Sequence, residues 1–598
     1  MTEDGAVGAG GAGGATSDTA AATAGAGTPA AHGGTGRPAD MLHLGVHAVA
    51  DGDRPAVVQA GTGEVTTYAE LDQRSRRLAG ALAARGLGPG GTIAVLLPNT
   101  SRYFDVVWAA QRAGLYYVPV NRHLVADEVA FIVADSGAQA LVSSDELREP
   151  AAAAAAALSA PAARFMIRDG GGAVAGGGGA AVVDRGAGAG ADKGAGAGAD
   201  KGAGAGAGAG AVPGFEDNAF EDFEEVVAGG DPGASPEVDG SVMFYSSGTT
   251  GRPRGIKRPL TGAAFGARTI LEQMLAFGYG FDEQTVYLCP APLYHAAPLG
   301  WSMGAQRLGG TVVVMERFDA AEMLALVERH RVTHVQMVPT MFVRLLKLPA
   351  AQRAAADLRS LRVVVHAAAP CPVEVKRQMM DWWGPILHEY YAGSEVNGLC
   401  AIGPDEWLAH PGSVGRAVFG ELHIVGEDGE ELPPGEIGMI YFGGTPPFEY
   451  HNDPEKTRQA FDSRGWSTLG DLGHVDDEGY LYLSDRRTNL IITGGVNVYP
   501  REVEDVLALH PEVADVAVVG LPDPEMGQQV VAVVEPARPQ RAGPALEREL
   551  LEFCRGHLAH FKCPRTIRFD VALPRLATGK LAKHVLLAAL RAEAAGQA

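Results

Sequence analysis

Residues 244–259 read FYSSGTTGRPRGIKRP, the densest run of hydroxyls, glycines and positive charge in the chain. The glycines let the backbone approach a ligand closely, and the hydroxyls can donate hydrogen bonds to phosphate oxygens. The groups concerned are Ser246, Ser247, Gly248, Thr249, Thr250, Gly251, Arg252 and Arg254. A Walker A loop is excluded, because Ile256 and Lys257 stand where that pattern needs Lys and then Ser or Thr. The residues alone predict a phosphate-binding loop, with an unliganded polar loop as the alternative.

Composition narrows the class of protein. The chain has 598 residues, 46% of them hydrophobic, and a net charge of −22, which gives no basic field for nucleic acid or anionic lipid. Its five cysteines form no C-x-x-C pair, which argues against a disulfide framework and a zinc site. The acidic N-terminus lacks an apolar signal segment, and no apolar run is long enough to span a bilayer. We expect a cytoplasmic protein without a transmembrane segment; its oligomeric state stays open.

Two Gly/Ala-rich tracts divide the chain. Residues 1–40 and about 150–212 carry few large apolar side chains, so neither can offset the entropy of an ordered backbone. We predict a disordered tail and a disordered insertion within a large N-terminal domain, 41–484. After residue 484 the pattern changes to helix, strand, turn, strand and helix, which indicates a small C-terminal α+β domain, 485–598.

Within the large domain, strand and helix patterns alternate. Thr67 and Glu70 form a capping box before a run of leucines at helical spacing, and TIAVLLPN is a short buried strand that ends at a proline. Further apolar runs, GTVVVM, HVQMVP and LRVVVHAAAP, alternate with helical stretches. The expected fold class is α/β, with a large domain of parallel-rich sheets and helices and a small, mobile C-terminal domain.

The opening run resembles the signature loop of the adenylate-forming superfamily, which includes acyl-CoA synthetases, firefly luciferase and the adenylation domains of peptide synthetases. That loop reads roughly [YF]-[ST]-S-G-[ST]-T-G-x-P-K-G, and only Arg254 departs from it, in place of lysine. Further motifs of the family follow in the family's order: HAAAPCP, EYYAGSE, STLGDLGHVDDEGYLYLSDRR, LIITGGVNVYP and LPRLATGK. The resemblance runs from about residue 45 to the C-terminus and is greatest to bacterial fatty-acyl-CoA synthetases of the FadD type.

The resemblance implies a nucleotide site for ATP. Tyr391 would stack on adenine, Asp471 would accept hydrogen bonds from the ribose hydroxyls, and Arg486 would be the second nucleotide contact. The complete set is Ser246, Ser247, Gly248, Thr249, Thr250, Gly251, Arg254, Ala368, Tyr391, Ser394, Asp471 and Arg486. The resemblance also implies that Glu395 holds Mg²⁺, and that Lys580, Thr250 and Glu395 are the catalytic residues.

The remaining roles concern the acid, CoA and domain rotation. The resemblance places an acyl pocket at His295, Leu299, Met303, Ala392 and Gly393. Where amino-acid-activating members carry an aspartate this chain has His295, so an amino-acid substrate is disfavoured. The alternative for His295 is a packed core histidine. The resemblance also implies that the pantetheine arm of CoA passes Gly494 and Gly495. It places the interdomain hinge at Thr488, where the family usually has Asp or Lys.

We therefore expect an ATP-dependent acyl-CoA ligase that activates a hydrophobic carboxylic acid as acyl-AMP and transfers the acyl group to CoA. A fatty acid is the preferred candidate for the substrate. The partners of the ligase would be the small-molecule acid, ATP with Mg²⁺, and CoA, without nucleic acid. Three alternatives stay open: an enzyme that loads a carrier-protein phosphopantetheine, a ligase for aryl, steroid or bile acids, and a non-catalytic member of the family.

Overall fold

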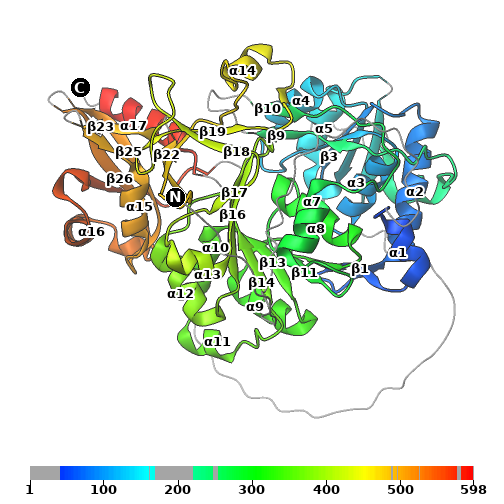
Figure 1. Cartoon of the computed structure of the whole chain (residues 1–598). Coiled ribbons are helices and arrows are strands. Elements are labelled where there is room, and N and C mark those ends of the chain that lie inside the picture. Colours follow the sequence, from blue (N-terminus) through cyan, green and yellow to red (C-terminus); the bar gives the residue numbers. More distant parts are fainter. Residues whose placement is uncertain are drawn as a thin grey trace, which may run out of the picture. The chain divides into compact units, whose positions relative to one another are not determined.

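The computed structural model describes residues 41–160, 162–168, 220–246, 253–486, 489–493, 496–523, 526–575 and 581–596 (Figure 1). The expected tail, 1–40, lies outside these ranges. The described helices of the large domain are α1 (Leu44–Asp51), α2 (Tyr68–Ala84), α3 (Arg102–Arg112), α4 (Ala126–Asp135), α5 (Arg148–Ala156), α6 (Phe223–Gly229), α7 (Ile270–Gln273), α8 (Ala296–Arg307), α9 (Ala320–His330), α10 (Pro339–Leu346), α11 (Ala350–Ala355), α12 (Val373–Trp383), α13 (Pro404–Ala409) and α14 (Pro454–Gln459).

A nine-stranded sheet is the first of two large sheets. Its strands, in spatial order, are β17 (Arg416–Phe419), β16 (Leu399–Ile402), β15 (Leu387–Ala392), β14 (Val363–His366), β13 (His334–Met337), β11 (Val286–Cys289), β12 (Thr311–Val314), β1 (Pro55–Gln59) and β2 (Val65–Thr67). The central strands from β15 to β1 are parallel, whereas β17, β16 and β2 are antiparallel to their neighbours. β11, β12, β13 and β14 are short apolar runs, almost completely buried, as parallel strands covered on both faces require.

The second large sheet has six strands and is parallel in every described pairing. Its order is β7 (Glu221–Asp222), β6 (Ala163–Ile167), β5 (Ala140–Ser144), β3 (Thr92–Leu96), β4 (Tyr116–Pro119) and β8 (Ser241–Val242). One apolar core joins elements of both sheets, since Val57 of β1, Tyr287 of β11 and Ile93 of β3 belong to the same buried cluster. The predicted capping box at the start of α2 is confirmed, because Thr67 and Glu70 bond each other's backbone N–H.

The disordered insertion was predicted to begin too early. Residues 148–156 form α5 and residues 163–167 form β6, which pairs with β5. An alanine run has high helix propensity, and Ala151 and Ala154 bury their methyl groups, while Phe165 and Met166 supply the apolar side chains that the Gly/Ala repeat lacks. The rest of the expected insertion, from residue 169, lies outside the described residues.

Two small sheets carry much of the candidate site. One has three antiparallel strands, β20 (Glu449–Tyr450), β10 (Arg254–Lys257) and β9 (Phe244–Ser246). The other has four, β18 (Glu421–Val425), β19 (Gly438–Gly443), β21 (Asp471–Val475) and β22 (Leu481–Arg486). β22 extends two residues past the predicted domain boundary at 484, so that boundary falls inside a paired strand.

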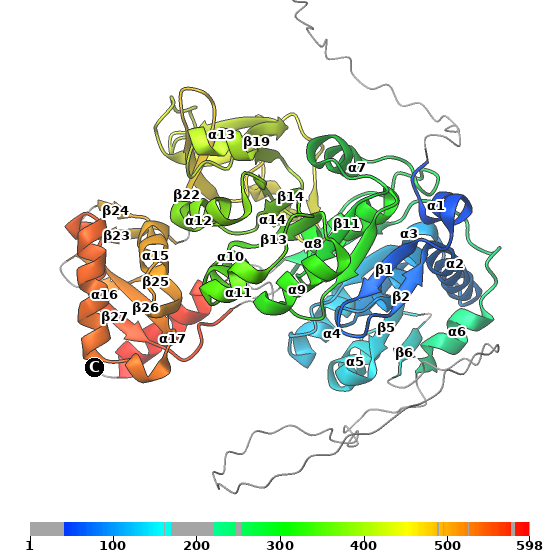
Figure 2. The ribbon, with the colours of Figure 1, turned by 90° about the horizontal axis from the view of Figure 1, so that it is seen from below.

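The C-terminal segment forms a mixed sheet with helices packed around it (Figure 2). Its elements are β23 (Ile491–Thr493), β24 (Val496–Val498), α15 (Pro500–Ala508), β25 (Val513–Asp523), β26 (Gly527–Pro536), α16 (Pro544–His557), β27 (Thr566–Phe569) and α17 (Lys583–Gly596). Alternate residues of β25 bury opposite faces: Val518 joins the cluster with α15 and α16, and Val519 joins the cluster with α17. The α/β fold class with a small C-terminal α+β part is confirmed. No helix within the described ranges is long and apolar enough to cross a membrane.

Candidate nucleotide and acyl site

Strands β9 and β10 form a hairpin around the predicted phosphate loop (Figure 1). Ser246 lies opposite Arg254 in its register, so the two ends of the loop are held side by side. The loop itself, with Ser247, Gly248, Thr249, Thr250 and Gly251, lies outside the described residues, and for Ser246 only the backbone is described. The two strands that flank the loop are therefore antiparallel and adjacent, while the roles of its hydroxyls stay predictions.

Arg254, the one departure from the signature, has an acidic neighbour. Its Nε lies 3.7 Å from Oδ2 of Asp453, and the two side chains are 18% and 38% exposed. Asp453 also caps α14, because its other carboxylate oxygen accepts a hydrogen bond from the Lys456 N–H at 2.9 Å. The guanidinium at this position is therefore oriented toward α14, and a phosphate would compete with Asp453 for it.

The predicted adenine turn has an unusual backbone. Ala368 has a φ of +72°, the left-handed region that alanine avoids because of its Cβ. The turn directly follows β14, whose last residue, His366, is paired with Glu389 of β15. Strain of this kind persists only where the surrounding structure fixes it, and it is common at ligand sites. The exposed Ala368 is thus held at the end of a buried strand, in the place that the motif predicted.

Two of the predicted nucleotide residues, Tyr391 and Asp471, are in contact, and the backbone of a third, Arg486, lies opposite Asp471. Tyr391 of β15 donates its phenolic O–H to Oδ2 of Asp471 at 2.7 Å. Asp471 begins β21 and lies opposite Arg486 of β22 in the register of that pair, although the Arg486 side chain is outside the described set. Gly470, directly before Asp471, has a φ of +83°, so glycine is required for this turn. Segments about 80 residues apart in sequence therefore form one site.

Glu395 lies in the turn after β15 and is only 8% exposed. Its Oε1 accepts a hydrogen bond from the Tyr450 hydroxyl at 2.9 Å, and its backbone carbonyl accepts one from Nη2 of Arg258 at 2.6 Å. The next residue, Val396, has a φ of +49°, and Ser394 before it is exposed. The carboxylate is thus rigidly held within a strained turn.

The surroundings of Glu395 fit a magnesium ion that also contacts ATP. Mg²⁺ prefers hard oxygen ligands and is usually bound by one or two carboxylates together with phosphates and water. Glu395 supplies such a carboxylate, with a defined orientation at one oxygen. Its other oxygen, Oε2, lies 2.8 Å from the position that a Cβ on Gly393 would take, so any larger residue at position 393 would press against the carboxylate.

The predicted acyl-pocket residues lie on two contacting elements. His295 precedes α8 and packs against Tyr294, with ring centroids 4.4 Å apart; Leu299 and Met303 are buried on α8. The sulfur of Met303 accepts a hydrogen bond from the Tyr117 hydroxyl at 3.6 Å. Ala392 ends β15 and Gly393 follows it.

Aromatic side chains connect α8 to β15. The rings of Trp301 and Tyr390 stack with centroids 5.9 Å apart, and Tyr279 packs on Trp301 at 5.1 Å. The substrate role of the predicted pocket stays a prediction, as do those of the hinge Thr488, of Gly494 and Gly495, and of Lys580, which are outside the described ranges.

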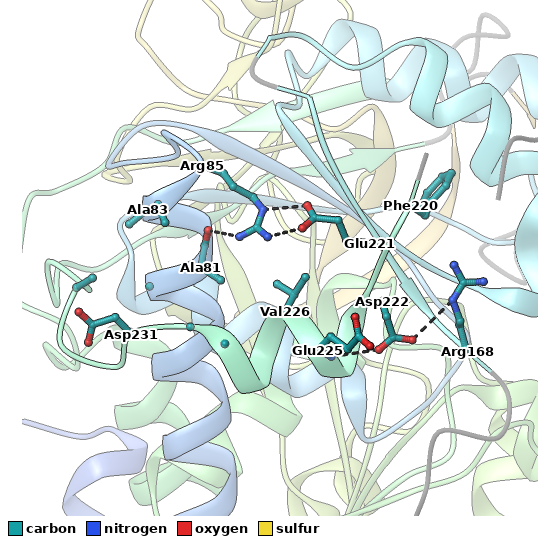
Figure 3. A pocket seen from close by; sticks show the side chains of 15 residues that line it. Ala81, Ala83, Arg85, Arg168, Phe220, Glu221, Asp222, Glu225, Val226 and Asp231 are labelled. Atoms are coloured by element: carbon teal, nitrogen blue, oxygen red, sulfur yellow. Dashed lines mark hydrogen bonds and ion pairs between the residues drawn. The ribbon is translucent and has the colours of Figure 1, made fainter. Parts of the chain in front are cut away.

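A hollow of about 950 Å³ lies elsewhere, between α2 and α6 (Figure 3). Its arginines are paired within the protein: Arg85 forms a bidentate contact with Glu221, and Arg168 lies 3.6 Å from Asp222. No predicted site residue lines it, and its floor is the α2–α6 contact of the main core. We do not assign it to the nucleotide or to the acid.

The sequence did not reveal Tyr450 and Arg258 as neighbours of Glu395. Both are distant from it in the chain, by 55 and 137 residues. Arg258 stands in the opening run, so its charge was visible, but no pattern in FEYHNDPEKT marked Tyr450.

The α/β fold brings the strands that flank the predicted phosphate loop, the Tyr391–Asp471 contact and the buried Glu395 together in one unit, as is typical of the adenylate-forming class. The model of the AMP-binding enzyme family matches residues 46–448, and that of the AMP-binding enzyme C-terminal domain matches 502–580. The chain therefore belongs to the AMP-binding enzyme family, and it is an ATP-dependent acyl- or aryl-CoA ligase.

Individual relatives span nearly the full length. A feruloyl-CoA synthase of an Amycolatopsis species is 32% identical over 524 residues, 87% of this chain and 93% of the relative. The long-chain-fatty-acid–CoA ligase FadD13 of Mycobacterium tuberculosis is 30% identical over 536 residues, 89% of this chain and 94% of the relative. The crystal structure of ATP-bound MatB from Rhodopseudomonas palustris is similar with a TM-score of 0.70 and 26% identity, over 92% of this chain and 99% of that one.

Proposed function

We propose that this ligase activates a hydrophobic carboxylic acid, with a fatty acid as the first candidate, using ATP and Mg²⁺, and transfers the acyl group to CoA. The observation that carries the nucleotide half is the contact between Tyr391 and Asp471, with Glu395 in the turn that follows β15. These residues come from separate motifs, and a protein that had lost nucleotide chemistry would have no need to keep them together.

The first half-reaction forms an acyl-adenylate. A carboxylate oxygen of the acid attacks the α-phosphorus of ATP, a P–O bond to the β-phosphate breaks, and pyrophosphate leaves with the electron pair. We assign Asp471 to the ribose hydroxyls and Tyr391 to the face of adenine, so that the α-phosphate is oriented for attack. The phosphate loop, with Thr250, orients the β- and γ-phosphates, and Lys580 places a positive charge between carboxylate and α-phosphate. Glu395 would hold Mg²⁺, which would supply neutralisation of the phosphate charge.

The second half-reaction exchanges AMP for a thiol. The CoA thiol gives up its proton to solvent and its sulfur attacks the acyl carbon; the mixed-anhydride C–O bond breaks, and AMP leaves with the electron pair, with the thioester as product. We assign Gly494 and Gly495 to the passage of the pantetheine arm, and Thr488 to the hinge about which Lys580 is withdrawn. A threonine at the hinge forms neither of the charged contacts available to aspartate or lysine, so we expect the rotation rate to differ from that of relatives with those residues.

The choice of acid depends on the contact between α8 and β15. His295, Leu299 and Met303, with Ala392 and Gly393, offer aliphatic, small and aromatic surface and no carboxylate that would hold an ammonium group. The stacked rings of Trp301 and Tyr390, with Tyr279 packed at a tilt against Trp301, favour a second candidate, an aryl acid, because flat substrates gain from stacking. The two relatives described above, named for feruloyl-CoA and for long-chain fatty acids, include both types of substrate.

A panel of acids tests both candidates. Acetate, octanoate, palmitate, benzoate, ferulate and a steroid acid would each be supplied with ATP and Mg²⁺, and AMP release measured with and without CoA. We expect CoA-dependent AMP release with a hydrophobic acid and an acyl-CoA detected by mass spectrometry. A fatty-acid optimum supports the first candidate and a ferulate or benzoate optimum the second. Failure of every hydrophobic acid, with activity on acetate alone, would refute the proposal. Lys580→Ala is the control: it should bind ATP but release no AMP.

A further inference from the structure

Strand β20 connects the phosphate hairpin to the turn that carries Glu395. Tyr450 of β20 lies opposite Ile256 of β10, and Glu449 lies opposite Lys257. β10 is the strand that leaves the phosphate loop, and it also pairs with β9, the strand that enters it. The three strands therefore form one small sheet whose hydrogen bonds hold both ends of the loop at a fixed distance from Tyr450.

Two side chains from this sheet region hold Glu395. Tyr450, 9% exposed, donates its hydroxyl to Oε1 of the carboxylate at 2.9 Å. Arg258, the residue after β10, donates to the Glu395 carbonyl at 2.6 Å. Burial lowers the pKa of Arg258, and the Glu395 carboxylate opposes that shift by attraction. The backbone of Glu395 is thus held by Arg258, directly after β10, and its side chain is held by Tyr450 of the neighbouring strand β20.

The opposite side of the carboxylate is shaped by glycine. A Cβ on Gly393 would lie 2.8 Å from Oε2 of Glu395 and 2.2 Å from a methyl group of Leu469. One carboxylate oxygen is therefore bonded to Tyr450, and the other faces a position where a larger side chain cannot fit. A carboxylate held in this way keeps one orientation before any ligand arrives.

We propose that Tyr450 is a positioning residue for the metal carboxylate: its hydroxyl fixes the orientation of Glu395 and ties it to the phosphate hairpin through the β20–β10 pairing. The inference rests on the proposed function, in which Glu395 holds Mg²⁺. Hydrogen bonds to metal ligands commonly change metal affinity 10- to 100-fold, because they remove the freedom of the ligand to rotate away. Tyr450 touches neither acid nor nucleotide in this account and acts only through Glu395.

Tyr450→Phe tests the inference, since it removes one hydroxyl and keeps the ring in the core. Tyr480→Phe is the matched control, because Tyr480 is also buried and donates to another glutamate, Glu406, at 3.1 Å. ATP binding is measured by calorimetry in Mg²⁺ and, separately, in EDTA. We expect Tyr450→Phe to weaken ATP binding in Mg²⁺ about tenfold and to change binding in EDTA less than twofold. Tyr480→Phe should leave both unchanged.

The double variant Tyr450→Phe/Glu395→Gln provides the second test. If Tyr450 acts through the carboxylate, adding Tyr450→Phe to Glu395→Gln should cost less than a further twofold in MgATP affinity. A further tenfold loss would overturn the inference, because Tyr450 would then act on its own, and so would unchanged MgATP affinity in Tyr450→Phe. A wild-type protein whose ATP binding ignores Mg²⁺ would instead refute the metal role of Glu395, and the inference with it.

Discussion

A buried ion pair behind the adenine turn allows a quantitative prediction. Nζ of Lys376, on α12, lies 2.8 Å from Oε2 of Glu389 on β15, and the side chains are 0% and 7% exposed. His366 lies 3.4 Å from the same carboxylate oxygen, and the Lys376 ammonium sits 4.7 Å from the centre of the Trp407 ring. The charges balance if His366 is neutral, and burial together with the nearby Lys376 charge lowers the pKa of His366 well below its usual value.

The perturbation is Lys376→Met, which fills the space but leaves Glu389 without its cation. Breaking a buried pair in this way costs about 3–5 kcal/mol of folding free energy. Burial already raises the pKa of Glu389, so the carboxyl can escape this cost by taking up a proton. Keeping a glutamate protonated at pH 7, against an unfolded pKa of about 4.3, costs about 3.7 kcal/mol, which sets the upper limit.

This limit gives the prediction its pH dependence. The cost of protonating Glu389 falls by about 1.4 kcal/mol per pH unit as the pH decreases. We therefore expect Lys376→Met to lose about 3–3.7 kcal/mol at pH 7 and at most about 1.6 kcal/mol at pH 5.5. The double variant Lys376→Met/Glu389→Leu should recover most of the loss, since an apolar pair avoids the desolvation of both charges.

Urea unfolding followed by tryptophan fluorescence, at pH 7.0 and 5.5, measures these differences. The control is Arg377→Met on the same helix, where the side chain is 51% exposed and its pairing with Glu374 spans 4.0 Å; its effect should be below about 0.5 kcal/mol. A loss of less than about 1 kcal/mol for Lys376→Met at pH 7, or a loss that does not shrink at pH 5.5, would refute the reasoning.

Three other substitutions have definite expected outcomes. Gly393→Ala should push the glutamate carboxylate beside it and weaken MgATP binding at least tenfold, whereas Gly556→Ala, with open space around it, should be neutral by calorimetry. Burial lowers the pKa of His334 to about 4, although its hydrogen bond to the Tyr279 carbonyl opposes the shift. The free energy of unfolding should therefore fall by about 3 kcal/mol between pH 6.5 and 4, because the unfolded chain takes up a proton at His334 more readily. His334→Gln should reduce this pH dependence in urea titrations. Arg254→Lys should lower the KM for ATP or leave it unchanged, because lysine lacks the planar guanidinium that lies near Asp453 at the start of α14 and would be freer to contact phosphate. A KM raised tenfold would instead show that the guanidinium itself binds phosphate.

Local patterns were sufficient to predict most of the fold. The capping box at Thr67, the apolar strands of the large sheets and the amphipathic helices of the C-terminal part depend on residues within a few positions of one another. The insertion is the exception: by composition the alanine run of α5 resembles an extension of the Gly/Ala repeat, although alanine without glycine favours helix. Composition alone could not separate the two, whereas helix propensity would have.

The buried charges were missed for a different reason. Lys376 lies on the same face of α12 as Met379 and Met380, a position that helical periodicity assigns to the core. That spacing was visible in the sequence, but its partner Glu389 is on a strand, and nothing local indicates that the two side chains meet. A charged residue on the apolar face of a helix is therefore a signal that a buried partner exists, without showing which residue it is.

The contact between Tyr450 and Glu395 shows why motifs indicate candidate site residues more readily than the residues that orient them. A motif is a stretch of chain that touches the ligand, so its residues are close in sequence. An orienting residue needs only to touch the motif, and here the link passes from Glu395 to Tyr450 and, through strand pairing, to Ile256 next to the phosphate loop. Because that route crosses from one strand to another, the geometry that joins the proposed metal carboxylate to the predicted phosphate loop depends on sheet register. A substitution that shifts β20 by one residue would turn Tyr450 away and should weaken MgATP binding as much as removal of its hydroxyl.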